Sequence, residues 1–322
     1  MLHLRAPAKL NLYLRVLGKR PDGYHEIETL FERIDLADEL AFEPHDELAL
    51  TCTDPALSCG EDNLVTRAAR ALQQASGIAR GARIHLTKRI PIAAGLGGGS
   101  SDAAAALLGL NALWGLRWPP ARLAELGAGV GSEVAFFLGE APFAIGRGRG
   151  ERCEPLDMPR LWRGSLKANA EPVEPEPIAG AGALTHVLVV PPERLATTDV
   201  YAAWDQEASS EIDLTASPPS SSMVAHALRN GPDLAGLAKG LWNSLQPIAI
   251  RRCPVIATIQ SVLRRLGCEG VSVSGSGPAV FGICRDAAQA AAVAESLRRH
   301  PWRVEVVQTW RGEPVTLSGT TA

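Results

Sequence analysis

A run of glycines that feeds directly into an alanine-rich segment constrains this chain more than any other feature. Residues 91–105 read PIAAGLGGGSSDAAA, and the strand-like residues 82–90 precede them. Glycines let backbone N–H groups approach an anion closely, and the free N–H groups and positive dipole of a helix N-terminus attract the same charge. The order of strand, turn and helix is the one that phosphate-binding loops use. The run therefore predicts a site for a nucleotide triphosphate.

A purely structural explanation of this run stays open, because Ser100, Ser101 and Asp102 are ordinary helix-capping residues. Spacing excludes the better-known phosphate loops. The chain has no GxxxxGK[ST] sequence, and Ser100 stands where GxGxxG requires its third glycine. The HRD and DFG sequences of protein kinases are also missing. A phosphate site here would therefore be a different type of phosphate-binding loop.

Composition limits the class of protein without naming its function. With 322 residues, of which 46% are hydrophobic, the chain can bury one large core or two medium cores, and we expect two domains. A formal net charge of −3 offers no general attraction to nucleic acid or to an anionic membrane, so neither partner is expected. No apolar run approaches the ~20 residues of a membrane helix, and the six cysteines form no CxxC pair or zinc-ligand spacing. We expect a cytoplasmic protein that holds no metal through its own side chains.

Periodicity predicts the elements of the first half. Alternation over residues 8–14 predicts a strand with three leucines on one face and Lys9, Asn11 and Tyr13 on the other, so one face belongs to the core and the other is free for chemistry or water. The other expected elements are a helix over 62–76 closed by Gly77, a strand over 82–90, and a helix opened by Ser100 and ended at Gly115.

The second half is expected to mix helices and strands. A Pro-, Glu- and Gly-rich stretch at 157–185 is typical of a linker, and a Gly/Ser loop at 273–281 suggests the second wall of a cleft whose first wall is the glycine run. The remaining expected segments are a strand at 185–190, a polar stretch at 205–222, a helix at 256–266, a helix at 287–299 and a strand at 304–307.

Four segments in this order resemble the GHMP kinase superfamily. They are residues 7–12 (PAKLNL), 20–25 (RPDGYH), 95–104 (GLGGGSSDAA) and 274–278 (SGSGP). RPDGYH and GLGGGSSDAA together are most similar to the members that phosphorylate 4-diphosphocytidyl-2-C-methyl-D-erythritol in the non-mevalonate isoprenoid pathway. The resemblance implies an α+β fold of two domains, 1–156 and 157–322, with the active site in the cleft between them. It also implies ATP and Mg²⁺ as cofactors and a small-molecule substrate with a cytidine diphosphate moiety.

The resemblance assigns an ATP-binding role to three parts of the chain. Backbone N–H groups of the glycine run would wrap the phosphates, which Mg²⁺ would bridge, and two further segments would line the adenosine pocket. The residues implied are Asn63, Lys88, Pro91, Gly95, Leu96, Gly97, Gly98, Gly99, Ser100 and Ser101.

The resemblance also implies how the acceptor is held. Lys9 would lie between the acceptor hydroxyl and the γ-phosphate, where a cation stabilises charge on the transferred group, and Asn11 would hold the hydroxyl-bearing end. Tyr24 would stack on the cytosine, His25 would hydrogen-bond the edge of the base, and Tyr201 would form a second aromatic wall. Such stacking is worth about 1–3 kcal/mol per base.

The catalytic carboxylate departs from the family pattern. Related chains carry aspartate in a GxDVP-like segment, whereas residues 131–137 read GSEVAFF, so Glu133 is the candidate base. The two acids have similar intrinsic pKa values. The extra methylene moves the carboxylate by about 1.5 Å, however, and a displacement of ~1 Å can cost on the order of a hundredfold in rate. Gln246 and Ala279 also replace the acidic residue and the threonine that are usual at those positions.

Two alternatives to this kinase stay open at this point. One is a GHMP kinase for another small alcohol such as homoserine or mevalonate, although such acceptors have no base for Tyr24, His25 and Tyr201 to hold. The other is a nucleotide-binding descendant without catalytic activity, which the replacements at Glu133 and Gln246 keep open.

Overall fold

Two β-sheets organise the chain in the computed structural model, which describes residues 1–156, 183–208, 218–229, 233–312 and 315–316. The linker predicted at 157–185 therefore lies almost wholly outside the described residues. Within them, the first sheet runs in the order β12-β1-β2-β4-β3, with β5 and β8 pairing β2 and β1, and β6 pairing β5. Its strands are β1 (Leu2–Lys19), β2 (His25–His45), β3 (Leu48–Cys52), β4 (Gly81–Thr87), β5 (Phe143–Gly148), β6 (Arg152–Pro155), β8 (Trp242–Asn243) and β12 (Val315–Thr316).

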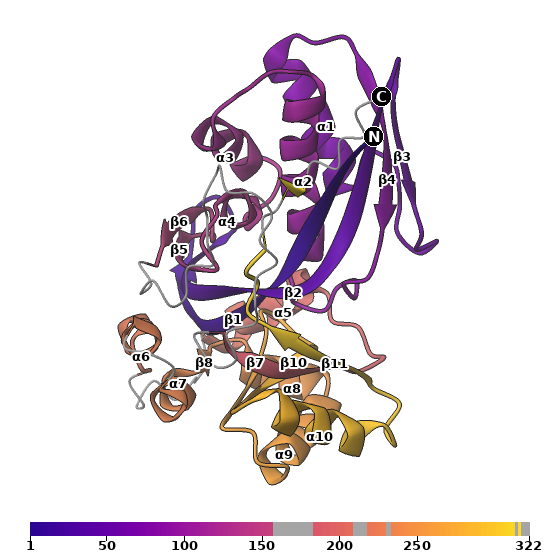
Figure 1. Cartoon of the computed structure of the whole chain (residues 1–322). Coiled ribbons are helices and arrows are strands. Elements are labelled where there is room, and N and C mark those ends of the chain that lie inside the picture. The colour runs from indigo at the N-terminus through magenta and orange to yellow at the C-terminus, as the bar shows by residue number, and fades with distance from the viewer. Residues whose placement is uncertain (157–182, 209–217, 230–232, 313–314, 317–322) are drawn as a thin grey trace.

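The second sheet is antiparallel and comes entirely from the second half of the chain. Its order is β11-β7-β10-β9, with β7 (Thr185–Val190), β9 (Gly270–Val273), β10 (Val280–Cys284) and β11 (Arg303–Gln308). In Figure 1 the first sheet and helices α1 to α4 form the upper part of the molecule, and the second sheet lies below with α8, α9 and α10. The two-domain α+β architecture is thereby confirmed. The exact division at 156/157 stays a prediction, because β8 and β12 return to the first sheet.

The helices follow the sequence signals closely, with shifted ends. In the first half they are α1 (Leu64–Ser76), α2 (Gly98–Leu113), α3 (Pro120–Ala128) and α4 (Val134–Leu138). In the second half they are α5 (Thr197–Ala208), α6 (Ser221–Arg229), α7 (Leu234–Gly240), α8 (Gln246–Arg252), α9 (Val255–Arg265) and α10 (Ala287–Leu297). The helices predicted at 256–266 and 287–299 and the strands predicted at 185–190 and 304–307 are confirmed.

Three predicted boundaries were wrong. The strand predicted over 82–90 ends at Thr87. The glycine-run helix begins at Gly98 rather than at Ser100, because Gly97 takes the left-handed conformation (φ 70°) that turns the chain into the helix. Ser100 and Asp102 thus lie inside the first turn instead of capping it. The polar stretch predicted at 205–222 is helical at both ends, since α5 continues to Ala208 and α6 begins at Ser221.

Small side chains let helix α2 run through the centre of the first domain. It contacts α1, α3 and α4 as well as β1 and β2, and it is buried around most of its circumference. A Cβ added to Gly109 would come within 2.6 Å of the Phe42 ring, so only glycine permits this approach of helix to sheet. The alanine-rich composition therefore lets the N-terminus of α2, where the phosphate site is predicted, lie against Lys9 in the middle of β1.

One ionisable cluster is fully buried where the two sheets meet. Glu32 of β2 and His186 of β7 are both 0% exposed, with Oε2 and Nε2 2.9 Å apart. The Thr309 hydroxyl donates to the other Glu32 oxygen at 2.7 Å. Buried partners of this kind stabilise a fold only together, because removing one leaves the other desolvated and unpaired.

We expect Glu32→Ala to lower the free energy of unfolding by about 3–5 kcal/mol, the usual loss when one partner of a buried pair is removed. Chemical denaturation measures the change. Glu295→Ala is the matched control, because its pair with Arg298 is exposed (62% and 76%) and such pairs are worth about 0–1 kcal/mol. Equal effects of the two substitutions would show that the buried cluster has no special weight.

Candidate active site

The ammonium group of Lys9 is the centre of the site. Lys9 lies on β1, is 2% exposed, and donates to three acceptors from three segments. Its Nζ lies 2.6 Å from Asn11 Oδ1, 2.9 Å from the Gly95 carbonyl oxygen and 3.0 Å from Glu133 Oε1. Since an ammonium group has three N–H donors, all of them are engaged. Lys9 therefore ties the first strand to the glycine loop and to the segment that carries the candidate base.

The orientation of Asn11 is fixed from its other side. Asn11 Nδ2 donates to the Thr29 hydroxyl at 2.8 Å, and that hydroxyl donates to the Tyr13 carbonyl oxygen at 2.6 Å. Asn11 and Thr29 are 2% and 0% exposed, so water does not compete for these bonds. This chain leaves the amide oxygen of Asn11 facing Lys9. The predicted pairing of Lys9 and Asn11 on one strand face is confirmed as a direct contact.

Glu133 reaches the lysine despite standing where the family has aspartate. It is the N-cap of α4, and its second oxygen, Oε2, lies against Gly97 at the start of α2. A Cβ on Gly97 would be 3.0 Å from Oε2, and the φ of 70° there already favours glycine. The Glu133 side chain is 26% exposed, so the carboxylate remains accessible to a ligand.

The glycine loop presents free backbone donors beside this carboxylate. The Ser101 N–H bonds to the Gly97 carbonyl oxygen at 3.0 Å as the first bond of α2. Helix geometry leaves the N–H groups of residues 97–100 without partners inside the helix. Together with the positive end of the helix dipole, they make an anion site about one turn wide. This geometry fits the predicted contact of residues 95–101 with phosphates.

The second glycine loop touches the first, as the sequence predicted. The Ser274 hydroxyl donates to the Gly95 carbonyl oxygen at 2.9 Å, and the Ala279 N–H donates to the Ala94 carbonyl oxygen at 3.3 Å. A Cβ on Gly95 would lie 2.1 Å from the Ser274 carbonyl oxygen, so the close approach requires glycine. Residues far apart in the sequence thus surround the Lys9 ammonium from both halves of the chain.

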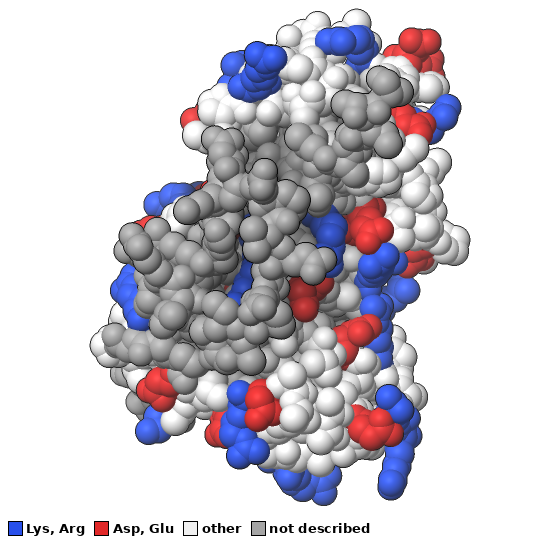
Figure 2. Space-filling view, viewed as in Figure 1, with Lys and Arg blue, Asp and Glu red and all other residues white. Residues whose placement is uncertain are grey.

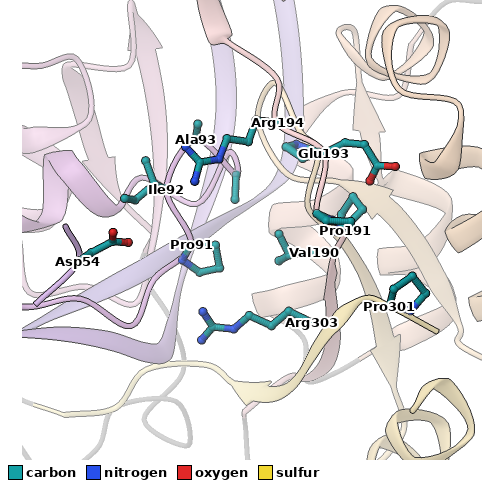
Figure 3. Close-up of a pocket in the computed structure, with 13 residues that line it drawn as sticks. Asp54, Pro91, Ile92, Ala93, Val190, Pro191, Glu193, Arg194, Pro301 and Arg303 are labelled. Atoms are coloured by element: carbon teal, nitrogen blue, oxygen red, sulfur yellow. The ribbon is translucent and has the colours of Figure 1, made fainter. Parts of the chain in front are cut away.

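The three residues predicted to line an adenosine pocket have structural partners of their own. Asn63 caps α1, accepting from Val65 N–H at 2.8 Å and donating to the Ser58 carbonyl oxygen at 2.6 Å. Pro91 lines a cavity of about 330 Å³ between the two halves, to which Arg194 and Arg303 also contribute (Figure 3). Lys9 and Glu133 do not line this cavity. Nucleotide binding by Asn63, Lys88 and Pro91 stays a prediction.

Lys88 lies between two buried carboxylates instead of extending toward solvent. Its Nζ lies 2.5 Å from Asp38 Oδ2 and 3.0 Å from Asp102 Oδ2, and all three side chains are at most 6% exposed. Burial raises the pKa of Asp102 well above its usual range, and neighbouring Asp38 adds to the rise, although Lys88 opposes it. The Lys88 ammonium offsets carboxylate charge beside the first turn of α2, where the phosphate site is predicted.

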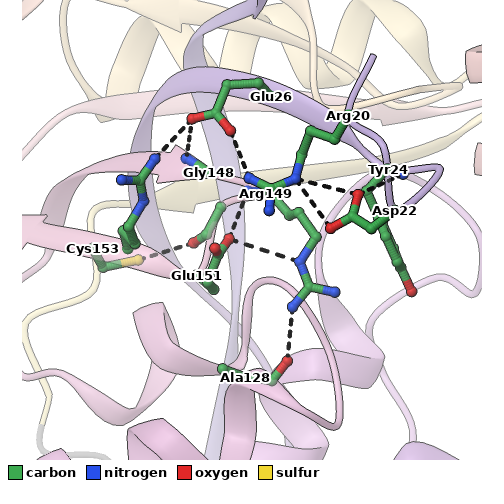
Figure 4. Close-up of polar contacts among 11 residues, drawn as sticks. Arg20, Asp22, Tyr24, Glu26, Ala128, Gly148, Arg149, Glu151 and Cys153 are labelled. Carbon is green, nitrogen blue, oxygen red and sulfur yellow. Dashed lines mark hydrogen bonds and ion pairs between the residues drawn. The ribbon is translucent and has the colours of Figure 1, made fainter. Parts of the chain in front are cut away.

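The structure places the three predicted base-binding residues, Tyr24, His25 and Tyr201, in one region. Their rings do not form a single stack. Tyr24 is 52% exposed, and the Arg149 guanidinium lies 4.6 Å from its ring centre (Figure 4). His25 stacks on Tyr201 with ring centres 4.6 Å apart. Burial raises the pKa of the Tyr201 phenol, and the charge of Glu133 adds to the rise. A stack of cytosine on these rings stays a prediction.

An ion-pair network holds the turn that carries Tyr24. Arg20 binds Asp22 and Glu26, and Glu26 also accepts from Arg152 and from the Gly148 N–H. Figure 4 shows these side chains joining the turn to the β5–β6 hairpin. On the face seen in Figure 2, acidic and basic side chains are interspersed, consistent with the small net charge.

Sequence patterns missed three residues of this region. Thr29 and Asp38 lie inside the long strand β2, where nothing local distinguishes them from surface polar residues. Asp205 was assigned to a polar stretch, yet it lies on α5 and binds His25. Its spacing of four residues from Tyr201 on a helix was the one available signal.

Replacing Asp102 by asparagine should remove a pH-dependent loss in the free energy of unfolding. Between the unfolded pKa of about 4 and the raised folded pKa, the folded chain binds more protons than the unfolded chain, so wild-type stability falls as pH rises, by up to about 1.4 kcal/mol per pH unit. Asp102→Asn should become progressively more stable than wild type across that window, measured by denaturation between pH 4.5 and 8. Exposed Asp46→Asn is the control, and the same profile in both variants would contradict the assignment.

The described residues contain no cluster of three or more potential metal ligands and no helix long and apolar enough to cross a bilayer.

Comparison with known proteins gives the family. Residues 63–140 match the model of the GHMP kinases N terminal domain, and residues 223–301 match that of the GHMP kinases C terminal. The 4-diphosphocytidyl-2-C-methyl-D-erythritol kinase of Pelotomaculum thermopropionicum is 40% identical over 95% of this chain and 96% of its own. The protein of the same name from Salinibacter ruber is 37% identical over 94% and 96%.

A solved structure agrees with the sequence relatives. The crystal structure of a 4-(cytidine 5'-diphospho)-2C-methyl-D-erythritol kinase superposes with a TM-score of 0.72 at 35% identity, covering 95% of this chain and 99% of the other. Sequence and fold thus agree over nearly the whole length. The chain belongs to the GHMP kinase family and, within it, to the 4-diphosphocytidyl-2-C-methyl-D-erythritol kinases.

Proposed function

We propose that this chain transfers the γ-phosphoryl group of ATP to a hydroxyl of 4-diphosphocytidyl-2-C-methyl-D-erythritol, a step in making isoprenoid precursors without mevalonate. The observation that carries the proposal is the 3.0 Å contact of Lys9 with Glu133 beside the free N–H groups of the glycine loop. Phosphoryl transfer needs chiefly positioning and charge stabilisation, and this arrangement offers a phosphate cradle, a cation and a base together. Because ATP is the donor, we expect the reaction to take place in the cytoplasm.

The residues divide the chemistry among them. The acceptor oxygen bonds to the γ-phosphorus while the bond from phosphorus to the bridging oxygen breaks, which releases ADP. Glu133 takes the proton of the acceptor hydroxyl through Oε2, the oxygen that does not bind Lys9. Lys9 stabilises the charge that grows on the transferred group, and Asn11 orients the hydroxyl-bearing end of the substrate.

Magnesium fits the oxygen donors present at this loop. Mg²⁺ usually keeps several waters and takes one or two protein oxygens together with substrate phosphates. The Ser100 hydroxyl lies on the first turn of α2 and is a hard oxygen donor at the predicted phosphate site. When bound, the ion would neutralise phosphate charge.

The first experiment measures ATP consumption by the purified protein with Mg²⁺ and one of several acceptors. We expect turnover with 4-diphosphocytidyl-2-C-methyl-D-erythritol and none with homoserine, mevalonate or no acceptor. Turnover with homoserine or mevalonate would support kinase activity but contradict the predicted cytidine-binding pocket. Measurable ATP binding without turnover on any acceptor would favour the non-catalytic descendant.

The role of Glu133 is tested by two substitutions. Glu133→Gln keeps the shape and a hydrogen bond to Lys9 but loses the base, so kcat should fall by about 10²–10⁴ with little change in ATP affinity. Glu133→Asp keeps the base but shortens its reach, so a fall of about a hundredfold is expected. Steady-state kinetics and ATP titration separate these effects. A Gln variant with wild-type kcat would exclude Glu133 as the base.

A further inference from the structure

Three side chains of helix α5 hold the imidazole of His25. The His25 ring stacks on Tyr201 at 4.6 Å with an interplanar angle of 29°, and the Trp204 ring meets it edge-on at 5.5 Å. His25 Nε2 lies 2.6 Å from Asp205 Oδ1. Trp204 and Asp205 follow Tyr201 by three and four residues, so each lies on the side of the helix that Tyr201 occupies. With its side chain only 9% exposed, His25 has its plane and one of its nitrogens fixed before any ligand arrives.

Asp205 acts on His25 as an ionised acceptor. Partial burial tends to raise the pKa of Asp205, but hydrogen bonds from Lys19 and His25 outweigh it, so the pKa is lowered overall. Lys19 Nζ lies 2.6 Å from Oδ2, the oxygen that His25 does not use. An ionised carboxylate can only accept hydrogen bonds. The hydrogen in the bond to Asp205 therefore belongs to His25 Nε2.

The state of Nε2 decides what the other nitrogen offers. A neutral imidazole with its hydrogen on Nε2 carries a lone pair on Nδ1. Within the part of the chain that the structure describes, no group hydrogen-bonds Nδ1 of His25. An acceptor at this position can receive the exocyclic amino group of a base, but it is repelled by a carbonyl oxygen. Cytosine presents an amino group at C4, whereas uracil presents an oxygen there.

We propose that Asp205 is a specificity-determining positioning residue, which fixes the Nε2–H tautomer of His25 and thereby makes the site select a cytidine diphosphate acceptor over its uridine counterpart. This inference rests on the proposed function, because it assumes that His25 meets the edge of the base. Asp205 itself touches neither the acceptor hydroxyl nor Lys9 in this role. Its effect should appear in the choice of base and in acceptor KM rather than in saturated kcat.

The first test reads the tautomer directly and needs no substrate. In wild type, ¹⁵N NMR of the imidazole should show a protonated Nε2 and an unprotonated Nδ1 for His25, assigned by its loss in His25→Ala. Asp205→Ala should shift this signature toward a mixture of tautomers. A wild-type spectrum with the hydrogen on Nδ1 would overturn the proposal whether or not the protein is the proposed kinase.

The second test measures base choice with a matched pair of acceptors, the cytidine and uridine diphosphate derivatives of methylerythritol. Wild type should prefer the cytidine form in kcat/KM, and Asp205→Ala should reduce this preference by about tenfold to a hundredfold, since a hydrogen-bonding site rejects an analogue that leaves its polar group unpaired. Saturated kcat with the cytidine form should stay near wild type. An equal loss on both acceptors would mean a purely structural role and would overturn the proposal.

Two further variants tie the effect to the contact. Lys19→Ala removes the other partner of Asp205 but leaves the bond to His25, so it should keep the base preference. In His25→Ala, adding Asp205→Ala should change the preference no further, because the two residues act as one unit. An additive effect in the double variant would contradict action through His25. If wild type turns over neither acceptor, calorimetric binding of CDP and UDP replaces the kinetic measurement.

Discussion

The burial of a single ammonium group constrains the rest of this structure. Lys9 is 2% exposed, and an unpaired buried cation would cost several kcal/mol, so each of its three hydrogens must find an acceptor. The acceptors come from β1 itself, from the carbonyl of Gly95 and from Glu133 before α4. Satisfying Lys9 therefore requires the glycine loop and the candidate base to be in place together. The requirement of stability and the requirement of the chemistry are met by the same contacts.

The second half of the chain completes this site through hydrogen bonds to backbone carbonyl oxygens and not through ion pairs. Ser274 binds the same Gly95 oxygen that Lys9 uses, and Asn243 donates to the carbonyl oxygens of Val273 and Gly275. Such contacts hold a loop at a fixed distance without adding charge near a phosphate site. The close approach at Gly95 leaves no room for a Cβ, so the two loops act as one surface.

Local signals were sufficient for much of the fold and for part of the site. Periodicity located β1 and placed Lys9 and Asn11 on one face, and the glycine run located the N-terminus of α2. The prediction that this face is free for water fails at Tyr13, which is fully buried. The second half of the chain covers this face of β1. Alternation along one strand carries no information about what packs on that strand.

Local sequence signals could not predict contacts between residues that are distant in the sequence. Asp38 is separated by fifty residues from Lys88, and only the folded sheet brings their charges together. Asp205 was assigned to a polar stretch because the residues after it are polar, whereas its own role depends on helical spacing from Tyr201. A pattern shows which face a residue shares, but tertiary packing decides which group that face meets.

Glutamate at position 133, where the family has aspartate, is accommodated by the local backbone. Helix α4 begins at Val134, with Glu133 as its N-cap. The start of the helix fixes the backbone position from which the carboxylate must reach Lys9. A glutamate then spans the distance at 3.0 Å, and Gly97 leaves space for its second oxygen. The glutamate at this position therefore brings a carboxylate to the lysine from the backbone position that the start of α4 fixes.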